Sequence, residues 1–96
     1  MTNASISVTT ATNDGGWTFG VQVAQPNGQT RHQVTLTQQD FTTLTDGKAI
    51  TPEDLIRRSF EFLLERGAKE SIQRQFDLPA ITRFFPEYPA EIRKRI

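Results

Sequence analysis

His32 is the only histidine in this chain of 96 residues, and the chain contains no cysteine. An imidazole can act as a general base or bind a transition metal, but a metal site here would depend almost wholly on carboxylates. No serine stands in the glycine-flanked turn that presents a hydrolase nucleophile. The sequence therefore predicts no catalytic residue, no cofactor and no metal ligand, and it assigns His32 a structural role on the core-facing side of a strand.

Two other patterns could carry chemistry. Glu61 and Glu65 lie one helical turn apart and could form a pair of acid–base carboxylates. Arg57 and Arg58 share the same arc, which favours a solvated, internally paired stripe instead. The glycine-rich stretch at residues 13–16 lacks the helix and the lysine that follow a phosphate-binding loop, so we interpret it as a turn.

The aromatic stretch Phe84-Phe85-Pro86-Glu87-Tyr88 is the most informative segment. Its rings can close a small second core, or one ring can stay exposed as an anchor for a partner. Adjacent phenylalanines cannot both point inward on one helix face, so the two roles are compatible. A basic end follows, which could contact phosphates or simply be solvated. The candidate partner-binding residues are Phe84, Phe85, Tyr88, Arg93, Lys94 and Arg95.

The overall charge narrows the choice of partner. Eleven basic side chains balance eleven acidic ones, so net charge gives no argument for binding nucleic acid or an anionic membrane. The outer face of the expected sheet carries Ser, Thr, Gln and Arg31, without the aromatic rings on which RNA bases stack. No apolar run approaches about 18 residues, and the start MTNASISVTT does not resemble a signal peptide. We expect a cytoplasmic protein without a membrane span.

Charge and threonine divide the chain into two unlike halves. Residues 1–51 hold five charged side chains and twelve of the thirteen threonines, whereas residues 52–96 hold the other seventeen charges and four of the five prolines. A β-branched, weakly charged half is typical of sheet, and a half rich in Glu, Arg and Leu is typical of helix. Neither half is large enough for its own core, so we predict one α+β domain over residues 1–96.

Three strands are expected in the first half, because apolar and polar residues alternate at residues 5–9, 17–24 and 33–36. Turn sequences join them at residues 13–16 and 25–28. The pattern predicts a three-stranded antiparallel meander within residues 1–37.

The register of the second hairpin follows from burial. A two-residue turn at Asn27-Gly28 pairs Val21 with Val34, whereas a turn with a glycine bulge slips one residue and pairs Val21 with Gln33. A one-residue slip moves the whole apolar set to the other face, so burial favours the first register or a four-residue loop of the same parity.

Two helices are expected in residues 38–66. Thr37 can cap a short helix that carries Phe41 and Leu44 inward, and Thr51 can cap the main helix. The apolar residues of the main helix span roughly 200°, which is wider than one buried face requires; they are Leu55, Ile56, Phe60, Phe62, Leu63 and Leu64. We therefore expect this helix to be covered on both sides.

The second cover is expected from residues 67–96, a tail that prolines divide into short helices. Asp77 can cap a helix that begins near Pro79, Pro86 ends that helix, and Pro89 can start another.

The stretch SFEFLLERGAKESIQRQFDLPAITRFFPEY, residues 59–88, resembles the C-terminal signature of a family of short uncharacterised bacterial proteins. That family combines a Phe-Leu-Leu-Glu-Arg helix end, a Ser-Ile and Phe-Asp-Leu segment and a Phe-Pro-Glu-Tyr close. Gly67-Ala68 departs from the acidic residue and proline expected there, which implies a looser helix end. The resemblance implies no known activity. A more general similarity links the Asp-Gly-Gly-Trp turn, the alternating valines and the Thr-started acidic helix to sheet-and-helix antitoxins.

The sequence as a whole predicts an α+β domain: a three-stranded antiparallel meander, then a main helix and short C-terminal helices packed on one face of the sheet. We expect a non-enzymatic cytoplasmic protein that acts as a protein-interaction module or adaptor. The alternatives are an antitoxin-like or nucleic-acid-associated regulator and a small enzyme. The first and third strands would be edges of the sheet, and either could pair with a second copy of the chain or with another partner. Alternatively, the short helix at residues 38–45 or the N-terminal arm covers an edge and leaves a monomer.

Overall fold

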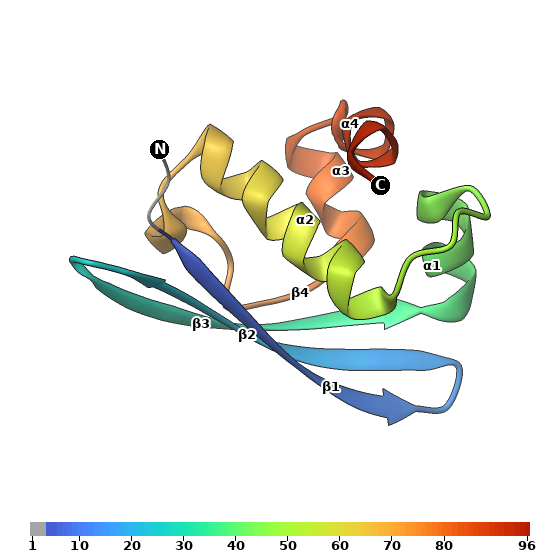
Figure 1. The fold of residues 1–96 in the computed structure, drawn as a ribbon, viewed down its shortest axis with the longest axis horizontal. Helices are drawn as coiled ribbons and strands as arrows, with labels where there is room; N and C mark the ends of the chain where they lie inside the picture. Colours follow the sequence, from blue (N-terminus) through green and yellow to red (C-terminus); the bar gives the residue numbers. More distant parts are fainter. Residues whose placement is uncertain (1–3) are drawn as a thin grey trace.

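A layer of helices covers one face of a four-stranded sheet in the computed structural model, which describes residues 4–96 (Figure 1). Residues 1–3, the start of the expected 1–37 meander, lie outside the described residues. The strands are β1 (Ser5–Asn13), β2 (Gly16–Gln25), β3 (Gly28–Thr37) and β4 (Gln75–Asp77). The α-helices are α1 (Gln38–Thr45), α2 (Pro52–Arg66), α3 (Ile81–Phe84) and α4 (Tyr88–Arg95), and the short 3₁₀ turns are η1 (Lys69–Ser71) and η2 (Leu78–Ala80).

The predicted meander is confirmed: β1, β2 and β3 are consecutive antiparallel neighbours. Asp14 and Gly15 form the first turn, and Gly15 adopts a φ of 81°, a conformation that glycine reaches without strain. Gly16 lies against β3, so a Cβ atom there would collide with the Leu36 carbonyl oxygen and come within 2.8 Å of the Thr37 Cα. The first turn therefore depends on two glycines for two different reasons.

The register of the second hairpin differs by two residues from the one that a turn at Asn27-Gly28 gives, and it has the parity that burial predicted. Val21 lies opposite His32, not opposite Val34, because Pro26 and Asn27 form the turn. A shift of two residues leaves every side chain on its expected face, since strand side chains alternate with period two. Val21, His32 and Val34 are accordingly all buried.

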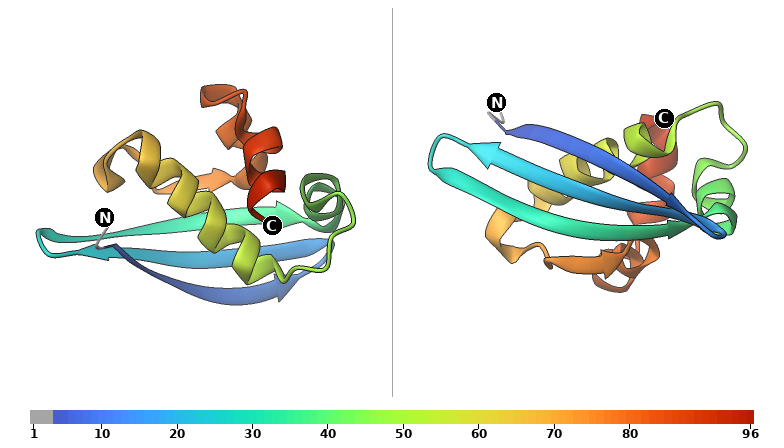
Figure 2. Two further views of the ribbon diagram at one scale, coloured as in Figure 1. Left: turned by 45° about the horizontal axis from the view of Figure 1, so that its top comes forward. Right: turned by 90° about the horizontal axis from the view of Figure 1, so that it is seen from below.

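The expectation that β3 is an edge strand is wrong. The three-residue strand β4 pairs with β3 in parallel, with Val34 opposite Phe76, and so becomes the border of the sheet. A strand this short has no room for an alternating pattern, which is why residues 75–77 were indistinguishable from the rest of the tail. The sheet therefore ends in β1 on one side and β4 on the other, as the view from below shows (Figure 2).

Helix α1 begins as predicted, because the Thr37 hydroxyl accepts a hydrogen bond from the Asp40 backbone N–H at 3.1 Å. Leu44 is buried, and the half-buried Phe41 packs edge-on against Trp17 of β2 with ring centroids 5.4 Å apart. This aromatic pair fixes α1 at the end of the sheet.

Helix α2 is covered on both sides, as its wide apolar arc predicted. Thr51 caps its first turn by accepting from the Asp54 N–H at 3.1 Å. Phe60 is fully buried on the sheet side, where its ring lies 5.4 Å from that of His32 and 6.1 Å from that of Phe76. Phe62 is fully buried on the other side, beneath the C-terminal helices. The main helix is thus the middle layer between the sheet and the tail (Figure 1).

The tail forms short helices separated at the prolines, but Asp77 does not cap the segment that begins near Pro79. Its carboxylate instead accepts a hydrogen bond from the Thr35 hydroxyl across the β3–β4 pair. The turn before α3 begins without a side-chain cap, and Pro79 starts it through its fixed φ. Within residues 4–96, none of the helices combines the length and the apolar character needed to cross a membrane.

Candidate functional site

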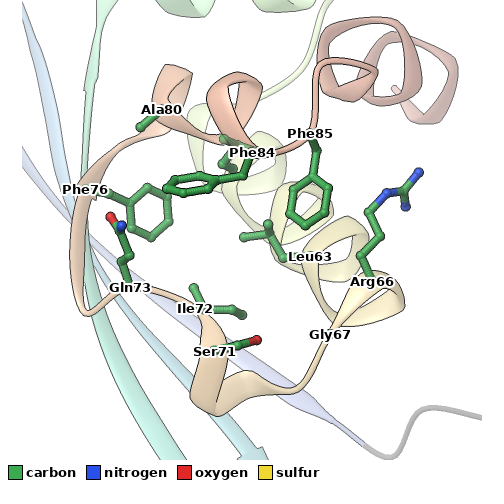
Figure 3. Close-up of a pocket in the computed structure, with 11 residues that line it drawn as sticks. Leu63, Arg66, Gly67, Ser71, Ile72, Gln73, Phe76, Ala80, Phe84 and Phe85 are labelled. Carbon is green, nitrogen blue, oxygen red and sulfur yellow. The ribbon is translucent and has the colours of Figure 1, made fainter.

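An apolar pocket with a volume of about 230 Å³ opens between the C-terminal half of α2 and the chain that runs from η1 to α3 (Figure 3). Most of its lining is hydrocarbon, and the polar groups lie at its borders. The lining residues are Leu63, Arg66, Gly67, Ser71, Ile72, Gln73, Phe76, Ala80, Ile81, Phe84 and Phe85.

Local sequence signals give the pocket its shape. Helix α2 ends where Gly67, in extended conformation, donates its N–H to the Leu63 carbonyl at 3.1 Å. The chain then runs back toward the sheet, and β4 delivers Phe76 to the floor beside α2. Pro86 cannot continue a helix, so α3 ends after one turn and leaves the two phenylalanines at the mouth.

Phe84 and Phe85 diverge, as their adjacency predicted. Phe84 is 61% exposed, and within residues 4–96 it is the one large apolar side chain that is mostly open to solvent. Phe85 is half-buried and packs edge-on against Phe62, with ring centroids 5.8 Å apart. One ring is thus held by the core and supports the pocket, while the other remains available at the rim (Figure 3).

Two polar side chains fasten the segment that forms the floor of the pocket. His32 is buried, and its Nδ1 lies 2.8 Å from the Gln73 carbonyl oxygen, which can only accept. His32 Nε2 lies 2.8 Å from the Thr30 hydroxyl, so both ring nitrogens lie within hydrogen-bond distance of a partner. Lys69 is only 1% exposed, and its ammonium donates to Asn27 at 3.2 Å and to Glu70 at 2.5 Å. Together they tie this segment to β3 and to the β2–β3 turn.

Arg66 forms the polar border of the pocket. Its guanidinium carbon lies 3.7 Å above the centroid of the Phe62 ring, and its Nε donates to Glu87 at 3.2 Å. The pKa of the Glu87 carboxyl is lowered, first by its own backbone N–H and then by Arg66. Arg66 is therefore held in place by an aromatic face and a carboxylate, and it does not offer a free charge to a ligand.

Tyr88 is part of the hydrophobic core. It is fully buried, its hydroxyl lies 2.6 Å from that of Ser59, and its ring packs edge-on against Phe62. Burial raises the pKa of the Tyr88 phenol far above its ordinary value. Of the three aromatic candidates, Phe84 and Phe85 line the pocket and Tyr88 closes the second core over α2.

The three basic candidates of the tail lie outside the pocket lining and have different surroundings. Arg95 forms two hydrogen bonds with the Glu65 carboxylate, at 2.7 and 2.6 Å, which lower the pKa of Glu65 and raise that of Arg95. Arg93 donates to the Thr43 carbonyl at 2.8 Å, which joins α4 to α1. Lys94 is 73% exposed and lies 3.6 Å from Glu91. Two of the three cations therefore hold the fold together.

A second, shallow hollow lies on the outer face of the sheet, where Gly20 has no side chain. Arg31 and Arg74 border it, together with Thr9 and Gln33. Neither arginine forms an ion pair with another residue of the described chain, 4–96. The sequence placed only Arg31 on this face; Arg74 joins it because β4 extends the sheet.

Within residues 4–96, no group of three or more His, Asp or Glu side chains lies together in a way that could hold a metal ion. His32 has both ring nitrogens engaged and its ring against Phe60. The surroundings of His32 are those of a structural residue.

The sequence identified the rim of the pocket but missed its floor and walls. Ile72 and Phe76 each lie in a short segment without a recognisable period, and Gly67 and Ala80 become part of a site only through the fold. The Ser-Ile and Phe-Asp-Leu pieces of the signature at residues 59–88 contain Ile72 and Phe76, and they were the available signal.

No family model, curated protein or solved structure matches this chain, so the resemblance of residues 59–88 to a bacterial family stays a prediction.

Proposed function

We propose that this chain is a non-enzymatic protein-interaction module that binds a segment of a partner protein by enclosing one of its large apolar side chains. The observation that carries the proposal is the position of Phe84, a 61% exposed ring at the mouth of an apolar pocket. A large apolar side chain that stays in water gains free energy when a partner covers it, by about 1.5–3 kcal/mol for full burial.

The size of the pocket favours a side chain over a complete small molecule. Its volume of about 230 Å³ is below the roughly 300–1,000 Å³ that encloses a drug-sized ligand. Two of the three polar side chains in its lining are already engaged: Arg66 contacts Glu87 and Phe62, and the Ser71 hydroxyl donates to the Ala68 carbonyl at 2.7 Å, which leaves the Gln73 amide at the border. A cofactor would need free polar groups to fix its orientation, whereas the side chain of a Leu, Ile, Met or Phe needs only hydrocarbon walls.

The support for the pocket is rigid, which favours binding without reorganisation. Phe85, Phe62 and Tyr88 form a continuous set of edge-on contacts behind it. His32 and Lys69 hold the floor segment through hydrogen bonds to Gln73 and Asn27. A preformed site loses little conformational entropy when a partner binds.

Selection from a displayed library of random peptides tests the proposal. The wild-type chain serves as bait, after depletion of the library on Ala80→Phe, which places a phenyl ring in the pocket. We expect the enriched peptides to share one large apolar residue. We also expect Phe84→Ser to weaken their binding about tenfold or more, as the loss of an interface anchor does.

The matched control is Arg83→Ser, which changes an exposed residue adjacent to Phe84 that does not line the pocket. It should leave the affinity within about twofold, as surface substitutions outside an anchor do. Peptides that bind wild type, Phe84→Ser and Ala80→Phe equally would contradict the proposal.

A nucleic-acid-associated role is the second candidate, supported by Arg31 and Arg74 at the hollow of the outer face. The guanidinium groups of Arg31 and Arg74, which form no ion pair within residues 4–96, can contact phosphates, although the hollow offers no exposed aromatic ring for base stacking. Gel retardation at low salt tests it. Binding that Arg31→Ser and Arg74→Ser together abolish would favour this role, and no retardation at any salt concentration would exclude it.

A further inference from the structure

Strand β1 is the long open border of the sheet. It has nine residues, whereas β4 at the opposite border has three (Figure 2). The expected third-strand edge is closed by β4, so β1 is the border that offers an extended ladder to another strand.

The pairing of β1 with β2 defines which backbone groups of β1 are unused. Asn13 lies opposite Gly16 across the two-residue turn, so the odd-numbered residues of β1 exchange hydrogen bonds with β2. The even-numbered residues direct their N–H and C=O groups away from β2; they are Ile6, Val8, Thr10 and Thr12. The free ladder thus extends over the whole strand.

Natural edge strands usually carry a feature that prevents pairing, such as a lysine, a proline, an inward charge or a bulge. The sequence of β1, SISVTTATN, contains no charged residue and no proline, and its pairing with β2 runs without a bulge. The strand also has no charge with which to select a partner of opposite sign. A neutral strand is compatible with a copy of itself.

We propose that β1 pairs antiparallel with β1 of a second copy, so that the chain forms a two-fold homodimer. The proposal concerns the border opposite β4 and does not depend on the pocket. Closed two-fold dimers are the commonest oligomers, because one self-complementary patch satisfies both subunits.

The full overlap of the two strands defines one register. It centres the two-fold axis on Thr9, so that Val8 faces Thr10 of the second copy and Ile6 faces Thr12. Each of these pairs brings outward N–H and C=O groups together. β-Branched residues then lie opposite β-branched residues along the inner face, a combination that stabilises antiparallel sheets.

The axis would run perpendicular to the sheet, which places the helices of both copies on the same side. The two four-stranded sheets become one continuous sheet, and each β4 remains a terminal strand. The pocket, whose floor includes Phe76 of β4, then stays open in both copies.

Light scattering coupled to size exclusion gives the first test. At about 50 µM the wild-type mass should be about twice the 10.9 kDa of one chain. Thr10→Pro removes an outward N–H that β2 does not use, so it should give the monomer mass while the circular dichroism stays folded. The control Thr10→Ala keeps this N–H and loses the same hydroxyl bond to Glu53, so it should remain a dimer. A wild-type mass of 10.9 kDa at this concentration would overturn the proposal.

A cysteine crosslink tests the register and does not rely on the folding of the proline variant. The chain has no cysteine, so Thr9→Cys introduces its only thiol. Thr9 would face its own copy in a non-hydrogen-bonded pair, where side chains approach closely enough for a disulfide. Ser7→Cys has an exposed position on the same face but faces Ala11 of the second copy, so it is the matched control.

We expect Thr9→Cys to form a crosslinked dimer at least about tenfold faster than Ser7→Cys under the same oxidant, because only the first thiol is held near its copy. Mixing Ser7→Cys with Ala11→Cys should restore fast crosslinking. Equal, slow rates for all these variants would overturn the register.

Discussion

The imidazole of His32 joins the middle of β3 to the backbone carbonyl of Gln73, at 2.8 Å and 41 residues further along the chain. Gln73 lines the pocket, and His32 pairs with Val21 of β2 within the meander. A single buried side chain thus connects the sheet that the first half of the chain builds with the site that the second half builds.

The role of His32 predicts a change in stability without a loss of binding. His32→Leu leaves the Gln73 carbonyl and the Thr30 hydroxyl without their partner, so the free energy of unfolding should fall by about 1–3 kcal/mol. His32→Gln can retain one of the two bonds and should lose less. Urea denaturation followed by circular dichroism measures both. Loss of peptide binding by His32→Gln with an unchanged unfolding curve would show that the residue acts in the site directly.

The double burial of α2 predicts a large effect for Phe60. Phe60→Ala leaves a cavity between α2, His32 and Phe76, so the free energy of unfolding should fall by about 3–5 kcal/mol. Phe41→Ala removes a half-buried ring at the end of the sheet and is the comparison, with a smaller expected loss. A loss below about 1 kcal/mol for Phe60→Ala would mean that the helix is not enclosed as described.

The two glycines of β2 should differ in their tolerance of a methyl group. A Cβ at Gly16 meets the backbone of Leu36 and Thr37, which cannot move without opening the β2–β3 pair. A Cβ at Gly20 meets only the Thr9 hydroxyl at 2.8 Å, and that side chain can rotate. Gly16→Ala should therefore lower the melting temperature far more than Gly20→Ala. Equal melting temperatures would contradict the close approach of Gly16 to the backbone of β3.

The Glu65–Arg95 pair predicts a small dependence of stability on acid pH. Hydrogen bonding to Arg95 holds the pKa of Glu65 below its ordinary value in the folded chain. A lowered folded pKa adds stability above the unfolded pKa, and this stability is lost as the pH falls through the folded pKa. The side chain of Glu65 is 49% exposed, and solvent screening limits the effect to about 0.5 kcal/mol.

Thermal unfolding of wild type and Glu65→Gln between pH 6 and pH 3 tests this prediction. We expect wild type to have the higher melting temperature at pH 6, and this difference should disappear as the pH falls. Glu61→Gln removes a carboxylate from the same helix without breaking the hydrogen bonds to Arg95. A difference between wild type and Glu65→Gln that grows as the pH falls would reverse the sign of the argument.

The regular elements could be predicted because the strands show an alternating pattern and the helices show an N-cap. Alternation placed β1, β2 and β3, and the threonines at positions 37 and 51 placed the starts of α1 and α2. The parity of the β2–β3 register was predicted, but the choice of Asn27-Gly28 as the turn was off by two residues, because Pro-Asn and Asn-Gly are both acceptable turns. Burial of the apolar side chains excludes a register shifted by one residue, but it cannot distinguish a register shifted by two residues from an unshifted one.

The site was predictable only at its rim. The adjacency of Phe84 and Phe85 predicted that one of the two rings would be exposed to solvent, and in the fold this ring is Phe84. The floor requires β4, whose three residues pair with β3 through a contact between positions about 40 residues apart. Such a pairing has no local periodicity, so Ile72 and Phe76 stood out in the sequence only as parts of the signature at residues 59–88, which does not place them in a pocket.

A methyl-resolved NMR titration of the wild-type chain with a peptide selected on it tests the central claim most directly. The lining of the pocket includes the methyl-bearing side chains of Leu63, Ile72 and Ile81. We expect the largest shift changes at these methyls and little change at Val21 and Val23 on β2, and Ala80→Phe should abolish the titration. Shift changes centred on β1 or the outer face of the sheet, with the pocket methyls unmoved, would contradict a protein-interaction module built on Phe84.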